Sequence, residues 1–123
     1  MSFLRRQESS VKKEEVMADF EVLEELFEVI KERQDADPEK SYAAKLFERG
    51  RPKIAQKFGE EAVELVIEAI ADNKKDAVAE SADVLFHMLM LWADMGIKPE
   101  KVMKELEKRK GKSGIEEKKN RKK

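Results

Sequence analysis

The chain has 123 residues, of which 41% are hydrophobic and 43% are charged, with a formal net charge of -1. This length suffices for one compact domain, and the balance of charges gives no general attraction to nucleic acid or to an anionic membrane. The absence of cysteine excludes disulfides and cysteine-ligated zinc, and a single histidine excludes multi-histidine metal sites. Because the longest apolar run is too short to span a bilayer and the charged N-terminus lacks a signal-peptide core, we expect a cytoplasmic protein.

The first part of the chain predicts an N-terminal extension followed by an amphipathic helix. Residues 1–18 carry few large apolar side chains and are compatible with a partly helical extension, to which we assign no chemistry. From Asp19, which suits an N-cap, apolar residues recur at spacings of three and four as far as about Arg33. The segment 34–40 then breaks the helix, because Pro38 disfavours helical geometry at the preceding residue.

Two helices are expected next. Ser41 can cap a short helix that stops at Gly50. Pro52 suits the first turn of the following helix, which runs to about Ala71.

The remaining chain predicts two more helices and a tail. A helix over about residues 75–95 ends at Gly96, and Pro99 opens a last one with a thin apolar seam. Residues 111–123 form a lysine-rich tail without a core pattern, which predicts disorder. No stretch has the alternating signature of a strand. The sequence therefore predicts an all-α bundle of about four to five helices in one domain at 19–110.

Carboxylates gather on one face of each of two predicted helices. At about 100° per residue, the face of the first helix is charged, and the rest of its circumference is almost wholly apolar. This face holds Lys53, Lys57, Glu60, Glu61, Glu64 and Glu68. The narrow stripe on the second helix holds Asp76, Glu80, Asp83 and His87, with Asp94 further on. Because the link between the helices is short, they should pack antiparallel, with their carboxylates at similar heights and facing each other.

These carboxylates predict a magnesium site. Residues three apart on a helix point the same way, so Glu61 with Glu64 and Glu80 with Asp83 could grip one or two Mg²⁺ ions. Such an ion polarises phosphoryl oxygens and lowers the pKa of a bound water. Glu60, beside the cluster, could orient or deprotonate that water.

A basic rim adjoins the carboxylates. Lys53 and Lys57 lie on the same face one and two turns earlier, where they could contact phosphate oxygens. The rim is extended by Lys45, Arg49 and Arg51. Tyr42 could pack in the core or touch a base.

Two alternatives to a magnesium site rest on the same residues. Solvated helix faces usually interleave charges, whereas Glu60, Glu64 and Glu68 place like charges four apart, which destabilises a helix without a compensating cation. A di-iron carboxylate bundle uses Glu-x-x-His pairs, whereas Asp83 and His87 are four apart and no second histidine exists. We interpret His87 as a hydrogen-bonding residue of the core or its rim, not as a ligand.

The ordered motifs resemble the phosphoribosyl-ATP pyrophosphohydrolase family over roughly residues 20–109. The matching parts are SYAAKLFERG at 41–50, KFGEEAVE at 57–64 and the E-x-A-D pattern at 80–83. The resemblance implies a MazG-like fold completed by dimerisation to a homodimer. It also implies Mg²⁺-dependent hydrolysis of 1-(5-phosphoribosyl)-ATP to 1-(5-phosphoribosyl)-AMP and pyrophosphate, the second step of histidine biosynthesis.

The resemblance assigns roles to individual residues. It implies metal ligands at Glu61, Glu64, Glu80 and Asp83, a supporting acid at Glu60, and phosphate contacts at Lys53 and Lys57. Two other functions stay open: a housecleaning nucleoside triphosphate pyrophosphohydrolase of the same superfamily, and a non-enzymatic helical interaction protein. The segment 41–50 favours the histidine pathway. The expected partner is a small nucleotide, with no nucleic acid and no membrane.

Overall fold

The structure is a computed structural model that describes residues 9–111, with side chains described from residue 20 onward. This range contains five α-helices and one short 3-10 helix, and no strand occurs within it. The elements are α2 (Ser9–Glu32), η1 (Arg33–Asp35), α3 (Tyr42–Arg49), α4 (Arg51–Ile70), α5 (Lys74–Met95) and α6 (Pro99–Arg109). The predicted all-α class is confirmed.

Local signals set most helix ends as the sequence predicts. The Ser41 hydroxyl oxygen accepts a hydrogen bond of 3.1 Å from the Ala44 N–H and so caps α3. Gly50 ends α3 with φ at 97°, and Gly96 ends α5 in the left-handed conformation with φ at 74°. Pro99 occupies the first turn of α6, where a missing N–H costs nothing.

The start of α2 differs from the prediction. The helix already covers residues 9–18, so Asp19 lies inside α2 and is not its N-cap. This segment contains no glycine or proline, and its lysines and glutamates are good helix formers, so nothing interrupts the helix before Asp19. The predicted tail falls outside the described residues except for Gly111. None of the helices in the described range has the length and apolar character that a membrane span requires.

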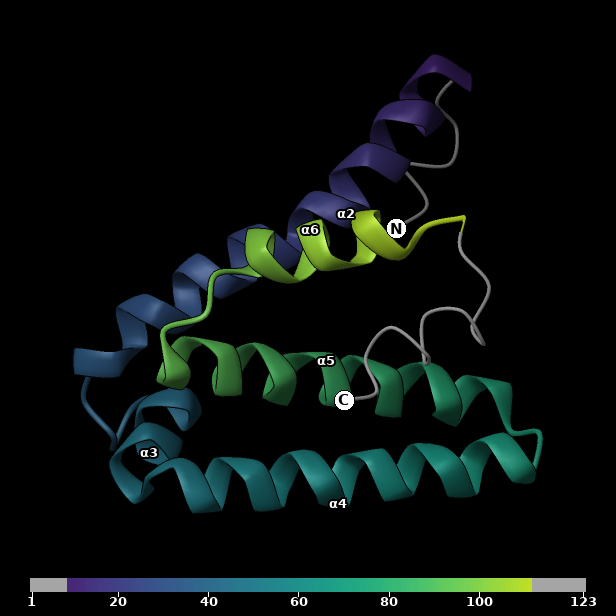
Figure 1. Cartoon of the computed structure of the whole chain (residues 1–123). Coiled ribbons are helices and arrows are strands. Elements are labelled where there is room, and N and C mark those ends of the chain that lie inside the picture. Colours follow the sequence, from purple (N-terminus) through teal and green to yellow (C-terminus); the bar gives the residue numbers. More distant parts are fainter. Residues whose placement is uncertain (1–8, 112–123) are drawn as a thin grey trace, which may run out of the picture.

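Helix α5 lies at the centre of the arrangement. It packs antiparallel against α4, and α2 and α6 lie on its other side (Figure 1). Residues 71–73 form the tight link between α4 and α5, with Asp72 at a φ of 57°. The Asn73 side chain then caps α5 by accepting a hydrogen bond from the Asp76 N–H. The link places the first half of α5 beside the second half of α4.

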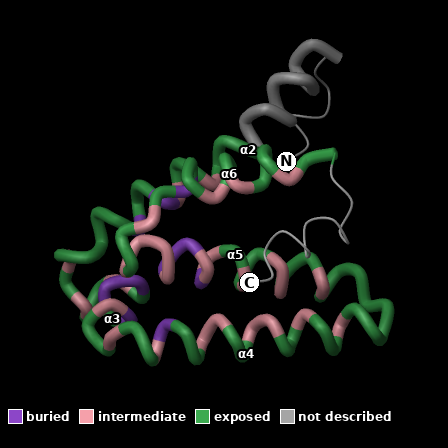
Figure 2. Tube along the Cα trace, viewed as in Figure 1, coloured by how far each residue is buried: buried purple, intermediate pink, exposed green. Residues whose placement is uncertain are grey.

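The hydrophobic core occupies one end of the molecule. Buried residues gather where α2, α3, the start of α4 and the second half of α5 meet (Figure 2). Its fully buried side chains are Ile30, Ile54, Leu89 and Met90. No residue between positions 55 and 86 is fully buried. The α4–α5 hairpin therefore projects from the core with its middle accessible, and the predicted carboxylate faces lie in that part.

The apolar face of α4 is open to solvent in the single chain. The sequence predicts that the circumference of this helix outside its charged face is almost wholly apolar, and on it Val66 is 58% exposed and Ile70 is 83% exposed. Val63 and Ile67 on the same helix are also exposed. The reason is that α4 contacts α3 and the core only near its start, and the rest of the helix packs on α5 along one side.

Candidate functional site

Three of the predicted metal ligands converge between α4 and α5. Glu61 on α4 and the pair Glu80 and Asp83 on α5 each offer one carboxylate oxygen, and these oxygens lie within 4.8 Å of one another. Glu80 and Asp83 are three residues apart, so they project from the same side of α5. Antiparallel packing brings Glu61 to the same height. Three carboxylate oxygens at this spacing suit a hard divalent cation.

Of the three carboxyl groups, that of Glu80 has a buried oxygen, Oε1, without a hydrogen-bond partner among the described residues. A hydrogen bond with Glu61, then burial and the negative charges of Glu61, Glu64 and Asp83, raise the pKa of Glu80 to about 7. Buried polar atoms are normally paired, so an orphan oxygen among like charges indicates a missing cationic partner. The residues present therefore fit a divalent metal ion.

Glu64 and Glu60 lie outside this group of three. Glu64 is exposed one turn after Glu61, and its charge is one of those that raise the pKa of Glu80. Glu60 accepts a hydrogen bond of 2.8 Å from Gln56 Nε2, and its other oxygen lies 3.5 Å from Lys57 Nζ. The hydrogen bond from Gln56, helped by the charge of Lys57, lowers the pKa of Glu60. Glu60 is therefore ionised at neutral pH.

The predicted phosphate contacts divide into two groups. Lys53 and Lys57 are half-buried on α4, and the positive charges of both act on Glu60. Lys45 and Arg49 are exposed on α3, and among the described residues no hydrogen bond or ion pair joins them to the carboxylates. The structure thus places two of the four cations beside the acidic face of α4.

Arg51 is tied to another helix. Its Nε atom lies 2.6 Å from Asp94 Oδ2, and its Nη2 atom donates to the Asp94 main-chain oxygen at 3.2 Å. Arg51 of the predicted basic rim and Asp94 beyond the predicted acidic stripe therefore form an ion pair with each other. It joins the start of α4 to the end of α5, at the end of the hairpin opposite the link at residues 71–73.

A hydrogen-bonded chain connects α3 to α5. The Tyr42 hydroxyl lies 3.0 Å from His87 Nε2, and His87 Nδ1 lies 2.7 Å from the Asp83 main-chain oxygen. His87 is only 3% exposed, which confirms its interpretation as a hydrogen-bonding residue of the core. The spacing of four between Asp83 and His87 is compatible with the bond from the His87 side chain to the Asp83 main-chain oxygen one turn earlier. Nothing in the sequence indicated the first, because Tyr42 is 45 positions from His87.

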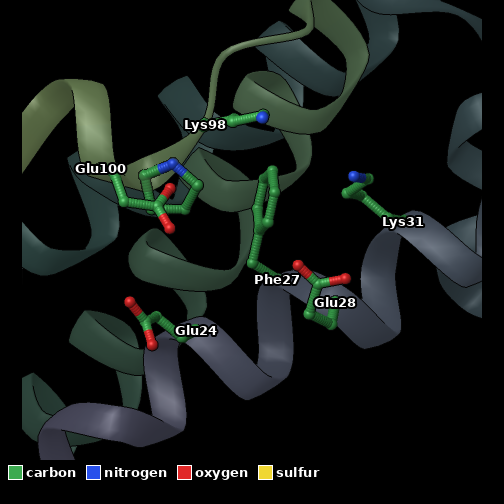
Figure 3. Close-up of a pocket in the computed structure, with 7 residues that line it drawn as sticks. Glu24, Phe27, Glu28, Lys31, Lys98 and Glu100 are labelled. Atoms are coloured by element: carbon green, nitrogen blue, oxygen red, sulfur yellow. The ribbon is translucent and has the colours of Figure 1, made fainter.

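A separate cavity of about 260 Å³ lies between α2 and the start of α6. Phe27 and Pro99 line it together with charged side chains of both signs (Figure 3). Those charged residues are Glu24, Glu28, Lys31, Lys98 and Glu100. The cavity shares no residue with the carboxylate group, so the two features are distinct.

Comparison with known proteins gives one consistent family. The family described as phosphoribosyl-ATP pyrophosphohydrolase matches residues 23–110, which include Glu60, Glu61, Glu64, Glu80 and Asp83. A phosphoribosyl-ATP pyrophosphatase of Paramagnetospirillum magneticum is 60% identical over 103 residues, covering 84% of this chain and 94% of the relative. The protein of the same name from Rhodospirillum rubrum is 55% identical, with coverages of 84% and 88%. That of Azospirillum brasilense is 54% identical over 101 residues, with coverages of 82% and 91%.

Proposed function

Because the chain belongs to the phosphoribosyl-ATP pyrophosphohydrolase family, we propose that it hydrolyses 1-(5-phosphoribosyl)-ATP to 1-(5-phosphoribosyl)-AMP and pyrophosphate. This reaction is the second step of histidine biosynthesis. The observation that carries the proposal is the convergence of Glu61, Glu80 and Asp83 within the matched residues. Because a triphosphate does not cross a lipid bilayer unaided, we place the reaction in the cytoplasm.

We propose Mg²⁺ as the cofactor, held by Glu61, Glu80 and Asp83, with Glu64 as a further acidic partner one turn along α4. The proposal is supported by the oxygen-only donor set and by the orphan Oε1 atom of Glu80. When bound, the ion would polarise phosphoryl oxygens and generate a nucleophile from water near neutral pH. The carboxylates must all be ionised to hold it, so binding displaces the proton that Glu80 retains up to about pH 7.

The remaining residues of the site act on the water and on the phosphates. Glu60 is ionised, and we propose that it accepts a hydrogen bond from the attacking water and orients it. Lys57 contacts Glu60 in the free protein and can turn to a phosphate oxygen when substrate arrives. Lys53 on the same face supports this charge. We propose that Lys45 and Arg49, both exposed, contact phosphate groups of the substrate from α3.

We propose that the enzyme is a homodimer. Two features support this: the exposed apolar face of α4, and an apolar groove of about 570 Å³ formed by α2, α5 and α6. The groove is lined chiefly by Phe20, Leu23, Met88, Trp92, Met103 and Leu106. A second copy of the chain would remove both surfaces from water, and burial of apolar area is favourable by about 25 cal/mol per Å².

The test is pyrophosphate release from phosphoribosyl-ATP, measured beside ATP and dUTP, with Mg²⁺ and with EDTA. We expect Mg²⁺-dependent release from phosphoribosyl-ATP alone. Release mainly from the ordinary triphosphates would instead indicate a housecleaning pyrophosphohydrolase, and no release from any substrate would indicate a non-enzymatic interaction protein. Each of these two outcomes would overturn the proposal.

The metal assignment needs its own variants. Glu64→Gln and Glu80→Gln keep the size of the side chain but remove the charge, and we expect each to lower kcat/KM at least tenfold. Glu107→Gln on exposed α6 is the matched control and should keep full activity. Full hydrolysis by Glu64→Gln would remove Glu64 from the metal site whichever substrate is used.

A further inference from the structure

The Tyr42 hydroxyl is held in a fixed hydrogen-bonding role by His87. The main-chain oxygen of Asp83 can only accept, so His87 Nδ1 carries the hydrogen of that 2.7 Å bond. In the neutral imidazole the other nitrogen is then an acceptor. The Tyr42 hydroxyl must therefore donate its single hydrogen to His87 Nε2 across 3.0 Å. Its oxygen keeps lone pairs that can accept a hydrogen bond from another molecule.

The Tyr42 side chain is held at its hydroxyl and is otherwise largely accessible to solvent. His87 is buried and stands edge-on to both Phe86 and Tyr42, with ring centroids 5.2 and 5.9 Å away. Tyr42 itself is 51% exposed, although its hydroxyl is anchored. An exposed aromatic side chain whose polar tip is held by a buried partner is suited to contact a ligand.

His87 links the Tyr42 hydroxyl to the turn of α5 that carries Asp83, because its Nδ1 atom lies 2.7 Å from the Asp83 main-chain oxygen. Partial burial raises the pKa of the Tyr42 hydroxyl, and the charges that act on it are those of Lys57, Glu61, Asp83 and Glu60. These are the residues proposed above to hold the metal, the water and the phosphates. The hydrogen-bonded link and these charge effects together place the hydroxyl near the carboxylate group, where α3 begins.

The direction of the hydrogen bond decides which part of the substrate suits this position. Phosphate oxygens only accept, so an oxygen whose hydrogen is already donated cannot bind them. Release of pyrophosphate cleaves the bond between the α- and β-phosphates, and the ATP ribose is attached to the α-phosphate. The hydroxyl groups of that ribose are the hydrogen-bond donors of the nucleotide that lie nearest to the cleaved bond. The phosphoribosyl group, attached to the base, lies further from the cleaved bond.

We propose that Tyr42 is a substrate-binding residue whose oxygen accepts a hydrogen bond from the 2′- or 3′-hydroxyl of the ATP ribose, and that His87 positions it. This inference rests on the proposed hydrolysis. It assigns the start of α3 to recognition of the sugar, and it gives the buried His87 a role in the site without contact to the substrate.

The test combines a variant with altered substrates. Tyr42→Phe removes only the hydroxyl, and phosphoribosyl-ATP analogues prepared from 2′-deoxy-ATP and 3′-deoxy-ATP each lack one ribose hydroxyl. For the parent substrate we expect kcat/KM of the variant to fall about three- to tenfold, as for a neutral hydrogen bond of about 1 kcal/mol. For one of the two deoxy substrates, the kcat/KM values of wild type and variant should agree within twofold, because the hydrogen bond to the ribose is already absent in wild type.

Three results would overturn the inference. These are an equal loss in Tyr42→Phe on all three substrates, no loss on the parent substrate, and a large change in the Mg²⁺ concentration for half-maximal rate. The control is Ser41→Ala, which removes the α3 cap but leaves Tyr42 in place; its effect should be the same on all three substrates. If wild type does not hydrolyse phosphoribosyl-ATP, the proposed function fails. The wild-type activity is therefore measured before any variant is tested.

A second measurement on the wild-type protein does not depend on folding of a variant. The chain contains a single tyrosine, so a ¹³Cζ-tyrosine label gives one NMR signal that belongs to Tyr42. We expect this signal to shift when phosphoribosyl-AMP is added, and to shift clearly less with the product that lacks the contacted hydroxyl. An unmoved signal at saturating product would contradict the contact.

Discussion

Glu80 and Glu61 face each other across the α4–α5 hairpin, and the hydrogen bond between their carboxyl groups is the largest cause that raises the pKa of Glu80 from 4.5 to about 7. Burial and the charges of Glu61, Glu64 and Asp83 act in the same direction. The metal-free folded chain therefore keeps a proton on Glu80 at pH values where the unfolded chain has lost it. The stability of the folded chain and the metal binding proposed above are both linked to that proton.

The first prediction concerns stability against pH in EDTA. Between pH 4.5 and about 7 the folded state binds more protons at Glu80 than the unfolded state does, so this group's contribution to the free energy of unfolding falls as pH rises. It is fully present below pH 4.5 and lost as pH passes 7. Urea unfolding across this pH range should show that the free energy of unfolding declines more steeply with pH in wild type than in Glu80→Gln. The exposed Glu107→Gln should keep the wild-type slope, and an equal slope in Glu80→Gln would contradict the shift.

The second prediction concerns metal binding and thermal stability. Like charges at Glu61, Glu64, Glu80 and Asp83 strain the metal-free hairpin, and a cation that binds only the folded state raises Tm with its concentration. We expect a rise in Tm across a Mg²⁺ titration at pH 8 that is greatly reduced in Glu80→Gln. NaCl at matched ionic strength is the control for general screening. A Tm that does not change with Mg²⁺ would count against a metal site between these helices.

The third prediction contrasts two glycines of the same region. Gly50 has φ at 97° and ψ at 168°, a conformation that is strained for other residues, so Gly50→Ala should destabilise the protein by about 1–3 kcal/mol. Gly59 lies inside α4, and a Cβ atom added there meets nothing within 4 Å. Gly59→Ala should therefore stabilise it by about 0.5–1 kcal/mol. Urea unfolding of both variants checks the opposite signs.

The fourth prediction tests the homodimer. Ile67 is 54% exposed on the apolar face of α4, and Ile67→Glu would place a charge in the proposed interface. We expect light scattering after size-exclusion chromatography to report twice the chain mass for wild type and a shift toward the monomer for the variant. Lys40→Glu, in the exposed loop before α3, is the control and should leave the mass unchanged. A wild-type monomer at all concentrations would refute the dimer.

Features set by neighbouring residues were predictable from the sequence. Ser41, Gly50 and Gly96 act through the backbone within a few positions, and each ends or begins a helix where the sequence indicates. The convergence of Glu61 with Glu80 and Asp83 was also predictable, because a short link between two regular helices leaves little choice of alignment. Asp19 shows the limit of such rules: a residue that suits an N-cap does not begin a helix when helix formers continue on both sides of it.

Features that depend on distant parts of the chain were not predictable. Arg51 meets Asp94 across 43 positions, and no local pattern separates a cation that pairs with a helix end from one on an open rim. The hydrogen bond between Tyr42 and His87 was equally unpredictable, because it depends on how α3 packs on α5. The exposure of Ile67 is a different case: periodicity shows that a face is apolar, but not whether the same chain covers it.

The three-residue link between α4 and α5 has a consequence for folding. All three converging carboxylates belong to one helical hairpin, so bringing them together closes a short loop at low entropic cost. Docking of α2 on α5 joins segments much further apart in sequence and is expected to be slower. We expect pulsed hydrogen exchange during refolding to show α4 and α5 amides protected before those of α2. The acidic site would then exist before the core is complete, and a cation present during folding could bind the hairpin early.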